Sequence, residues 1–80
     1  MKRFFVKICK SNTYVYYELS GETIKVYFEQ PIRNRINKLI LDCKGIILEQ
    51  DGFNNSEVAN YQLFLKRNIG HIQELIEQNI

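Results

Sequence analysis

Side chains that could carry out catalysis or bind a metal are few in this chain of 80 residues. The only histidine is His71, and the two cysteines are Cys9 and Cys43. Nucleophilic catalysis needs a serine or cysteine within reach of a base, and a structural zinc site needs four ligands. We place His71 on the solvent side of a helix and read Cys43 as a small buried apolar residue. We therefore expect no enzyme activity, no metal and no cofactor.

The nine acidic residues form no catalytic pattern either. Glu18 and Glu29 fall on the same side of adjacent predicted strands, but carboxylates beside lysines on a strand face are usually solvated charges. The stretch 49–52, Glu-Gln-Asp-Gly, is too short for a calcium loop and lacks the later bidentate glutamate. The four glycines stand alone rather than in a phosphate-binding loop. We read residues 49–52 as a turn.

Composition indicates one folded domain over residues 1–80. Hydrophobic residues make up 45% of the chain, which is enough for a core. Residues 4–6 are apolar, but Lys7 interrupts them, so we expect no signal peptide and a cytoplasmic protein. The net charge of +2 is unevenly spread, with the basic residues concentrated before Gly45. Such asymmetry is a weak indication of a polyanionic partner or of self-association.

The first third of the chain alternates between apolar and polar residues as strands do. Residues 2–10, 13–19 and 23–29 show this pattern and are separated by the turn signals Ser11-Asn12 and Ser20-Gly21. They predict three antiparallel strands in a meander with one apolar face.

Residues 31–43 predict a helix after these strands. Pro31 is the only proline and suits a first helical turn, while Gly45 stands where a helix commonly ends. Apolar residues recur between them at helical spacing, namely Ile32, Ile36, Leu39, Ile40 and Cys43.

Residues 46–50 predict a fourth strand and residues 56–79 a terminal helix. A strand–helix–strand crossover places the fourth strand beside the first, in the order 3-2-1-4. The helix follows the N-cap cluster 54–57, and its apolar spacing continues through Gly70. Residues 61–66 also alternate, so a strand there is the competing interpretation.

The predicted fold is an α+β two-layer sandwich in the order βββαβα, with a mostly antiparallel sheet and both helices on one face. The predicted core contains the residues on the apolar side of each period: Phe4, Val6, Ile8, Val15, Tyr17, Ile24, Val26, Phe28, Ile36, Leu39, Ile40, Leu65 and Ile69.

The terminal helix predicts self-association. A helix over residues 56–79 would be about 36 Å long, whereas a typical strand spans about 20 Å. Its apolar stripe should then extend past its own sheet and require a second chain. We expect a homodimer that contacts through Ile72, Leu75 and Ile76.

The other side of the sheet predicts a binding surface. Strand alternation places six aromatic and basic residues there, namely Phe5, Lys7, Tyr14, Tyr16, Lys25 and Tyr27. The tyrosines could be strand formers in cross-strand pairs, anchors of a protein interface, or a stacking platform for single-stranded nucleic acid. We expect a small non-enzymatic protein-interaction or regulatory module that self-associates. A regulator that binds single-stranded RNA or DNA through this face is the alternative.

Overall fold

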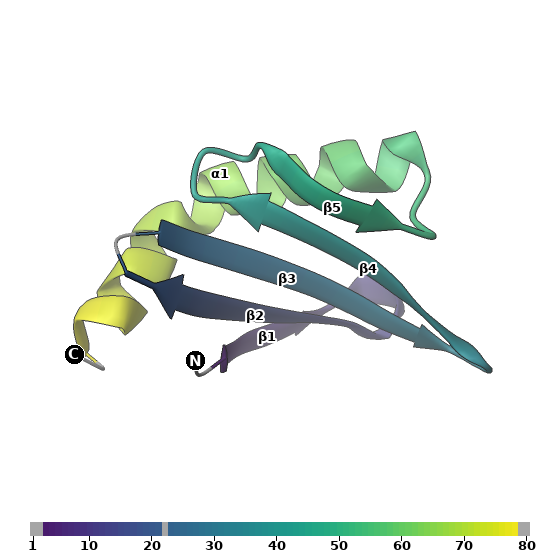
Figure 1. Cartoon of the computed structure of the whole chain (residues 1–80), viewed down its shortest axis with the longest axis horizontal. Coiled ribbons are helices and arrows are strands. Elements are labelled where there is room, and N and C mark those ends of the chain that lie inside the picture. The colour runs from purple at the N-terminus through teal and green to yellow at the C-terminus, as the bar shows by residue number, and fades with distance from the viewer. Residues whose placement is uncertain (1–2, 22, 79–80) are drawn as a thin grey trace.

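The computed structural model describes residues 3–21 and 23–78, which form one antiparallel sheet and one long helix (Figure 1). The five strands lie in the order β1-β2-β3-β4-β5. The α+β class is therefore confirmed. The elements in chain order are β1 (Arg3–Cys9), a 3-10 turn (Lys10–Asn12), β2 (Thr13–Ser20), β3 (Thr23–Ile32), β4 (Arg35–Asp42), β5 (Ile47–Asp51) and α1 (Asn55–Gln78).

Short turns join the strands into a continuous meander. Gly21 supports the β2–β3 turn with a φ of +62°, a conformation that glycine adopts without strain. Arg33 adopts a φ of 45° in the two-residue β3–β4 turn. The carboxylate of Asp42 accepts hydrogen bonds from the backbone N–H groups of Lys44, at 2.8 Å, and Ile46, at 2.9 Å. This carboxylate holds the loop between β4 and β5.

The predicted central helix over residues 31–43 is wrong, because these residues form the end of β3 and all of β4. Pro31 pairs with Ile36 of β4, while the pairing of β3 with β2 already ends at Glu29. Alternate pairs of a two-residue hairpin exchange hydrogen bonds, so the nitrogen of Pro31 faces the side where β2 is missing. Proline is tolerated at such a position. The order βββαβα is replaced by five strands followed by one helix.

The predicted strand order 3-2-1-4 is wrong for the same reason. Without a helical crossover after β3, the chain turns back directly, and β5 pairs antiparallel with β4 instead of lying beside β1. Strands β1 and β5 are consequently the two edges of the sheet.

Helix α1 lies across one face of the sheet (Figure 1). It begins with a reciprocal cap: Asn54 Oδ1 accepts from the N–H of Glu57 at 2.8 Å, and Glu57 Oε1 accepts from the N–H of Asn54 at 3.0 Å. The helix continues through Gly70 to Gln78. The competing strand over residues 61–66 is therefore excluded.

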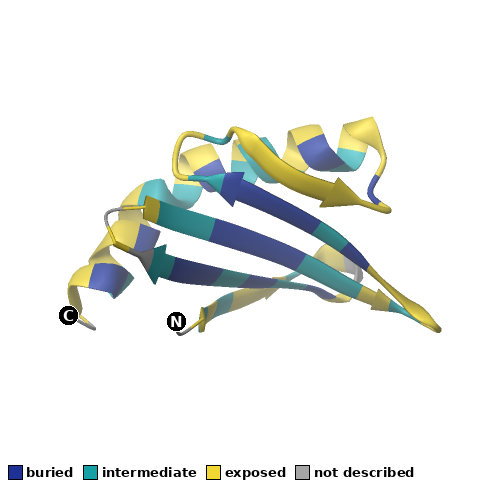
Figure 2. Ribbon diagram, viewed as in Figure 1, coloured by how far each residue is buried: buried dark blue, intermediate teal, exposed yellow. Residues whose placement is uncertain are grey.

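The core lies between α1 and the facing side of the sheet, where buried segments of both meet (Figure 2). The prediction that Ile8 and Ile36 belong to the core is wrong, because Ile8 is 51% exposed and Ile36 is 57% exposed. Ile40 is buried, but its side chain lies on the opposite side of the sheet from those of its neighbours Leu39 and Leu41. The predicted residues that are buried in the core are Val15, Tyr17, Val26, Phe28, Leu39 and Leu65, and those that sequence reasoning missed are Leu41, Phe53, Val58, Ile72 and Ile76.

Cys9 and Cys43 both carry free thiols. Cys43 is exposed rather than buried, because it belongs to the loop after β4 and not to a helix stripe. Within residues 3–21 and 23–78, no helix combines the length and the apolar character needed to cross a membrane.

Candidate functional site

The sheet face that points away from α1, here called the outer face, is the predicted binding surface. Residues that pair directly across two antiparallel strands point to the same side, so the register of the strands assigns them to a face. The outer face comprises Arg3, Phe5, Ile8, Tyr14, Tyr16, Glu18, Lys25, Tyr27, Glu29, Pro31, Ile36, Lys38, Ile40, Asp42, Glu49 and Asp51.

Lys7, predicted on the outer face, instead points to the helix side. The register of β1 shifts between Phe5, which pairs with Tyr16, and Lys7, which pairs with the buried Val15. The Nζ atom of Lys7 lies 5.6 Å from the centre of the Phe64 ring on α1. A β-bulge inserts one extra residue and so reverses the side on which the following residues lie. The same bulge moves Ile8 from the predicted core to the outer face.

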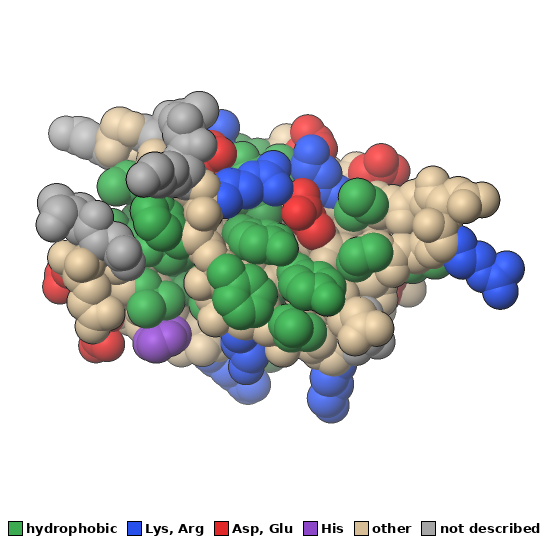
Figure 3. Space-filling model, turned by 90° about the horizontal axis from the view of Figure 1, so that it is seen from below, with side chains coloured by type: hydrophobic (Ala, Val, Ile, Leu, Met, Phe, Trp, Pro, Cys, Tyr) green, Lys and Arg blue, Asp and Glu red, His purple; other side chains and the backbone are tan. Residues whose placement is uncertain are grey.

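Four side chains on β1 and β2 form an exposed cluster, here called the outer patch: Phe5, Ile8, Tyr14 and Tyr16. Phe5 is 54% exposed, and its ring meets the Tyr16 ring edge-on at a centroid distance of 5.8 Å. Ile8 pairs with Tyr14, and both tyrosines are half-buried. From below, hydrophobic side chains form a continuous area with acidic and basic side chains at its border (Figure 3). The outer patch thus exposes apolar surface to water.

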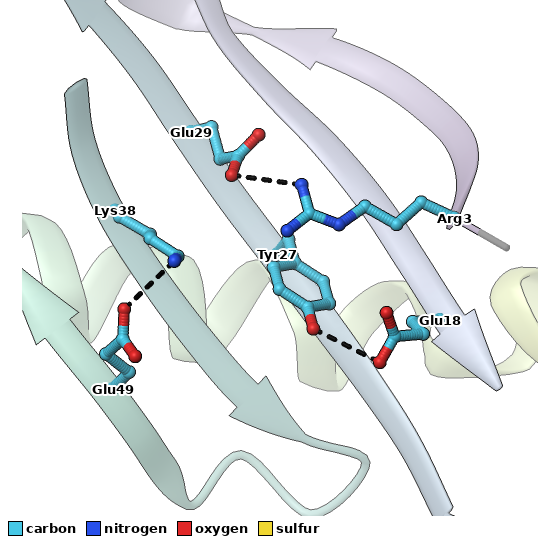
Figure 4. Close-up of polar contacts among 6 residues, drawn as sticks. All are labelled: Arg3, Glu18, Tyr27, Glu29, Lys38 and Glu49. Carbon is cyan, nitrogen blue, oxygen red and sulfur yellow. Dashed lines mark hydrogen bonds and ion pairs between the residues drawn. The ribbon is translucent and has the colours of Figure 1, made fainter. Parts of the chain in front are cut away.

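Tyr27 lies on the outer face but is only 6% exposed, because Arg3 covers it. The guanidinium carbon of Arg3 lies 4.0 Å from the centre of the Tyr27 ring, and its Nη1 forms an ion pair with Glu29 at 3.1 Å (Figure 4). The Tyr27 hydroxyl donates a hydrogen bond to Glu18 at 3.2 Å. Burial raises the pKa of Tyr27, and the charge of Glu18 raises it further. The face of this ring is already occupied by a cation.

The other outer-face cations also lie beside carboxylates. Lys38 Nζ forms an ion pair with Glu49 at 3.1 Å (Figure 4). Lys25 stands in register between Glu18 on β2 and Asp42 on β4. Among the residues that the structure describes, three basic and five acidic side chains lie on the outer face. Its electrostatic character is therefore mixed with an acidic excess, whereas the sequence suggested a basic surface.

The residues predicted to mediate self-association belong to the core of a single chain. Ile72 is completely buried and Ile76 is nearly so, while Leu75 packs against the same core. The apolar residues of this part of α1 are covered within their own chain, and the length mismatch on which the prediction depended is small because β3 has ten residues. At about 3.3 Å per residue this strand spans about 33 Å, which is close to the length of the 24-residue helix, about 36 Å.

Across the described ranges 3–21 and 23–78, no three or more His, Cys, Asp or Glu side chains gather closely enough to hold a metal ion. No family model, curated protein or solved structure is significantly similar to this chain.

Proposed function

We propose that the protein is a non-enzymatic interaction module that self-associates through its outer patch. The observation that supports this function is the exposure of Phe5 (54%) and Ile8 (51%) beside two half-buried tyrosines on one continuous surface. Contiguous apolar surface of this kind is uncommon on a small monomer and marks interaction sites. Tyrosine and phenylalanine are enriched in the buried centre of protein interfaces.

The outer face favours a protein over a nucleic acid as partner. Binding to phosphates requires cations that are free to replace counterions, but Arg3 and Lys38 already form ion pairs with carboxylates. Base stacking requires free aromatic faces, and the Arg3 guanidinium covers the ring of Tyr27. The acidic excess of this face would also repel a polyanion.

A second copy of the chain is the partner that matches this surface. In a two-fold symmetric dimer the same patch contacts itself, so the charges around its apolar centre must complement one another, as neighbouring groups of both signs do. The outer patch has such surroundings, because the exposed Arg3 lies near its edge on β1 and the ion-pair partner of Arg3, Glu29, lies opposite Tyr14 on β3. Packing two outer patches together removes Phe5 and Ile8 of both chains from water.

Sedimentation equilibrium over a concentration series tests this proposal. The wild-type chain should be dimeric at high micromolar concentration, and the Phe5→Ser/Ile8→Ser variant should be monomeric there. Ile36→Ser is the matched control, because Ile36 is equally exposed (57%) but lies on the distant β3–β4 hairpin. Circular dichroism should show that all three proteins are folded.

A wild-type chain that stays monomeric at high micromolar concentration contradicts the proposal. If Ile36→Ser dissociates the dimer and the Phe5→Ser/Ile8→Ser variant does not, the dimer interface lies at the β3–β4 hairpin instead. The wild-type chain could instead bind single-stranded RNA, with an affinity that falls as salt rises. If the Phe5→Ser/Ile8→Ser variant then loses this binding, the outer face is a nucleic-acid site.

A further inference from the structure

A second surface with a different character lies between β1 and α1. It is a groove of about 770 Å³. Residues 7–10 contribute one wall, and α1 contributes Asn60, Phe64, Arg67 and Asn68 to the other. These helix residues follow each other at spacings of four, three and one, so they lie along one side of α1. We call this surface the basic groove.

Three basic side chains, Lys7, Lys10 and Arg67, line the basic groove together with a single acidic one, Glu57. Glu57 already uses its Oε1 to cap the start of α1. Within residues 3–21 and 23–78, none of the three basic side chains forms an ion pair. The groove therefore presents unneutralised positive charge, in contrast to the outer face, and attracts an anionic ligand.

The basic groove also borders an open sheet edge. Among the strands that the structure describes, β1 pairs only with β2, so alternate backbone N–H and C=O groups on its other side have no partner in these strands. An extended peptide can pair with such an edge and contributes main-chain hydrogen bonds. Its alternate side chains then point toward the groove.

The aromatic side chains of the basic groove do not suit base stacking. The Phe64 ring contacts Phe28 edge-on at 5.9 Å and has Lys7 Nζ above it. The Tyr61 ring stacks on Phe28 at 4.8 Å and meets Phe53 edge-on at 5.2 Å. Since single-stranded nucleic acids depend on free aromatic faces, the groove matches an acidic peptide better.

We infer that the basic groove binds an acidic peptide in extended conformation, which adds as a strand to the free edge of β1. Carboxylates on alternate residues of the peptide contact Lys7, Lys10 and Arg67. The exposed amide of Asn60 adds a neutral hydrogen-bonding group to the helix wall. Ile8 is the one residue of the outer patch that also lines the groove, whereas Phe5, Tyr14 and Tyr16 lie outside it.

Fluorescence anisotropy with a labelled ten-residue peptide of alternating glutamate and valine tests the inference. The wild-type chain should bind this peptide at physiological salt and should bind the lysine–valine counterpart at least tenfold more weakly. The double charge reversal Lys10→Glu/Arg67→Glu should weaken binding at least tenfold. Arg35→Glu/Lys44→Glu is the matched control: it changes the net charge equally at two exposed positions outside the groove and should have less than a threefold effect.

Strand addition is tested separately with the same glutamate–valine sequence N-methylated at alternate residues. This peptide keeps its carboxylates but cannot donate those backbone hydrogen bonds, so it should bind at least tenfold more weakly. Equal affinity for both peptides would overturn the strand addition.

Several results would overturn the acidic-peptide site itself. The first is that the acidic peptide does not bind at millimolar concentration. The second is that Arg35→Glu/Lys44→Glu weakens peptide binding as much as Lys10→Glu/Arg67→Glu does. The third is that a ten-nucleotide oligouridylate binds more tightly than the peptide. Phe5→Ser/Tyr16→Ser changes the outer patch but spares Ile8 in the groove wall, and it should leave peptide binding unchanged. Failure of the outer patch to mediate a dimer is thereby distinguished from failure of the groove.

Discussion

The hydroxyl of Tyr61 on α1 lies 2.8 Å from Oγ1 of Thr13 at the start of β2. Thr13 is completely buried, and the ring of Tyr61 stacks on Phe28 in the middle of the sheet. One hydrogen bond therefore joins the helix to the sheet beside a cluster of aromatic rings. A buried hydroxyl that loses its partner is destabilising, so this contact specifies how α1 is positioned on the sheet.

We expect Tyr61→Phe to lower the free energy of unfolding by about 1 kcal/mol. The variant removes the hydroxyl, keeps the ring and leaves Thr13 Oγ1 without this partner. Thr13→Val should also be destabilising. Because each single change breaks the same bond, the double variant should cost less than the two single costs combined. Urea unfolding of the four proteins measures the coupling, and additive effects would show that the bond contributes nothing.

Stability should fall at alkaline pH through the buried Tyr27 and the half-buried Tyr61. Burial is the main cause that raises the pKa of both Tyr27 and Tyr61. A raised pKa in the folded state means that the unfolded chain loses these protons first. The two protonated tyrosines contribute fully to the free energy of unfolding below the ordinary tyrosine pKa of about 10. This contribution is lost as the pH rises through their higher pKa values in the folded state. Tyr27→Phe and Tyr61→Phe should each flatten this decline, measured as urea midpoints between pH 8 and pH 12. Tyr14→Phe, on the outer patch, provides the comparison.

Two glycine substitutions should have opposite effects on stability. Gly70 lies in α1 with no heavy atom within 4 Å of an added Cβ, so Gly70→Ala should raise the free energy of unfolding by about 0.5–1 kcal/mol. Gly52 has a φ of +93°, and an added Cβ would collide with the Asn37 side chain. Gly52→Ala should cost at least about 1–2 kcal/mol. Thermal unfolding ranks the variants, and a stabilising Gly52→Ala would contradict this geometry.

Two alanine substitutions in β4 distinguish a strand from the predicted helix. Leu41 is completely buried in the strand but lies outside the predicted helix stripe, whereas Ile36 belongs to that stripe and is 57% exposed. Leu41→Ala should cost about 2–5 kcal/mol, and Ile36→Ala should stay within about 0.5 kcal/mol. Chemical denaturation measures both. The reverse ranking would restore a helix over residues 31–43.

The local pattern of the sequence was sufficient for β1, β2, β3, β5 and α1, whose observed bounds lie close to the predicted ranges apart from the extension of β3 past Glu29. Each of these elements shows a strong period of its own, and turn or cap residues mark its ends. The capping box at Asn54 and Glu57 is one such signal. Strand alternation also placed Phe5, Tyr14 and Tyr16 together on one face, and the register confirms it.

Only tertiary pairing determined that residues 35–42 form a strand instead of a helix. It also determined on which side of the sheet Lys7 lies. Apolar residues at 32, 36, 39, 40 and 43 match a helical period, but Leu39 and Leu41 also match a strand that buries them beside Phe28 and Val26. Pairing with two neighbouring strands selects the second pattern. Such long-range contacts leave no local signal. The bulge in β1 has the same origin, because one extra residue against β2 reverses the side of every residue that follows. Lys7 thereby leaves the outer face and joins the basic groove.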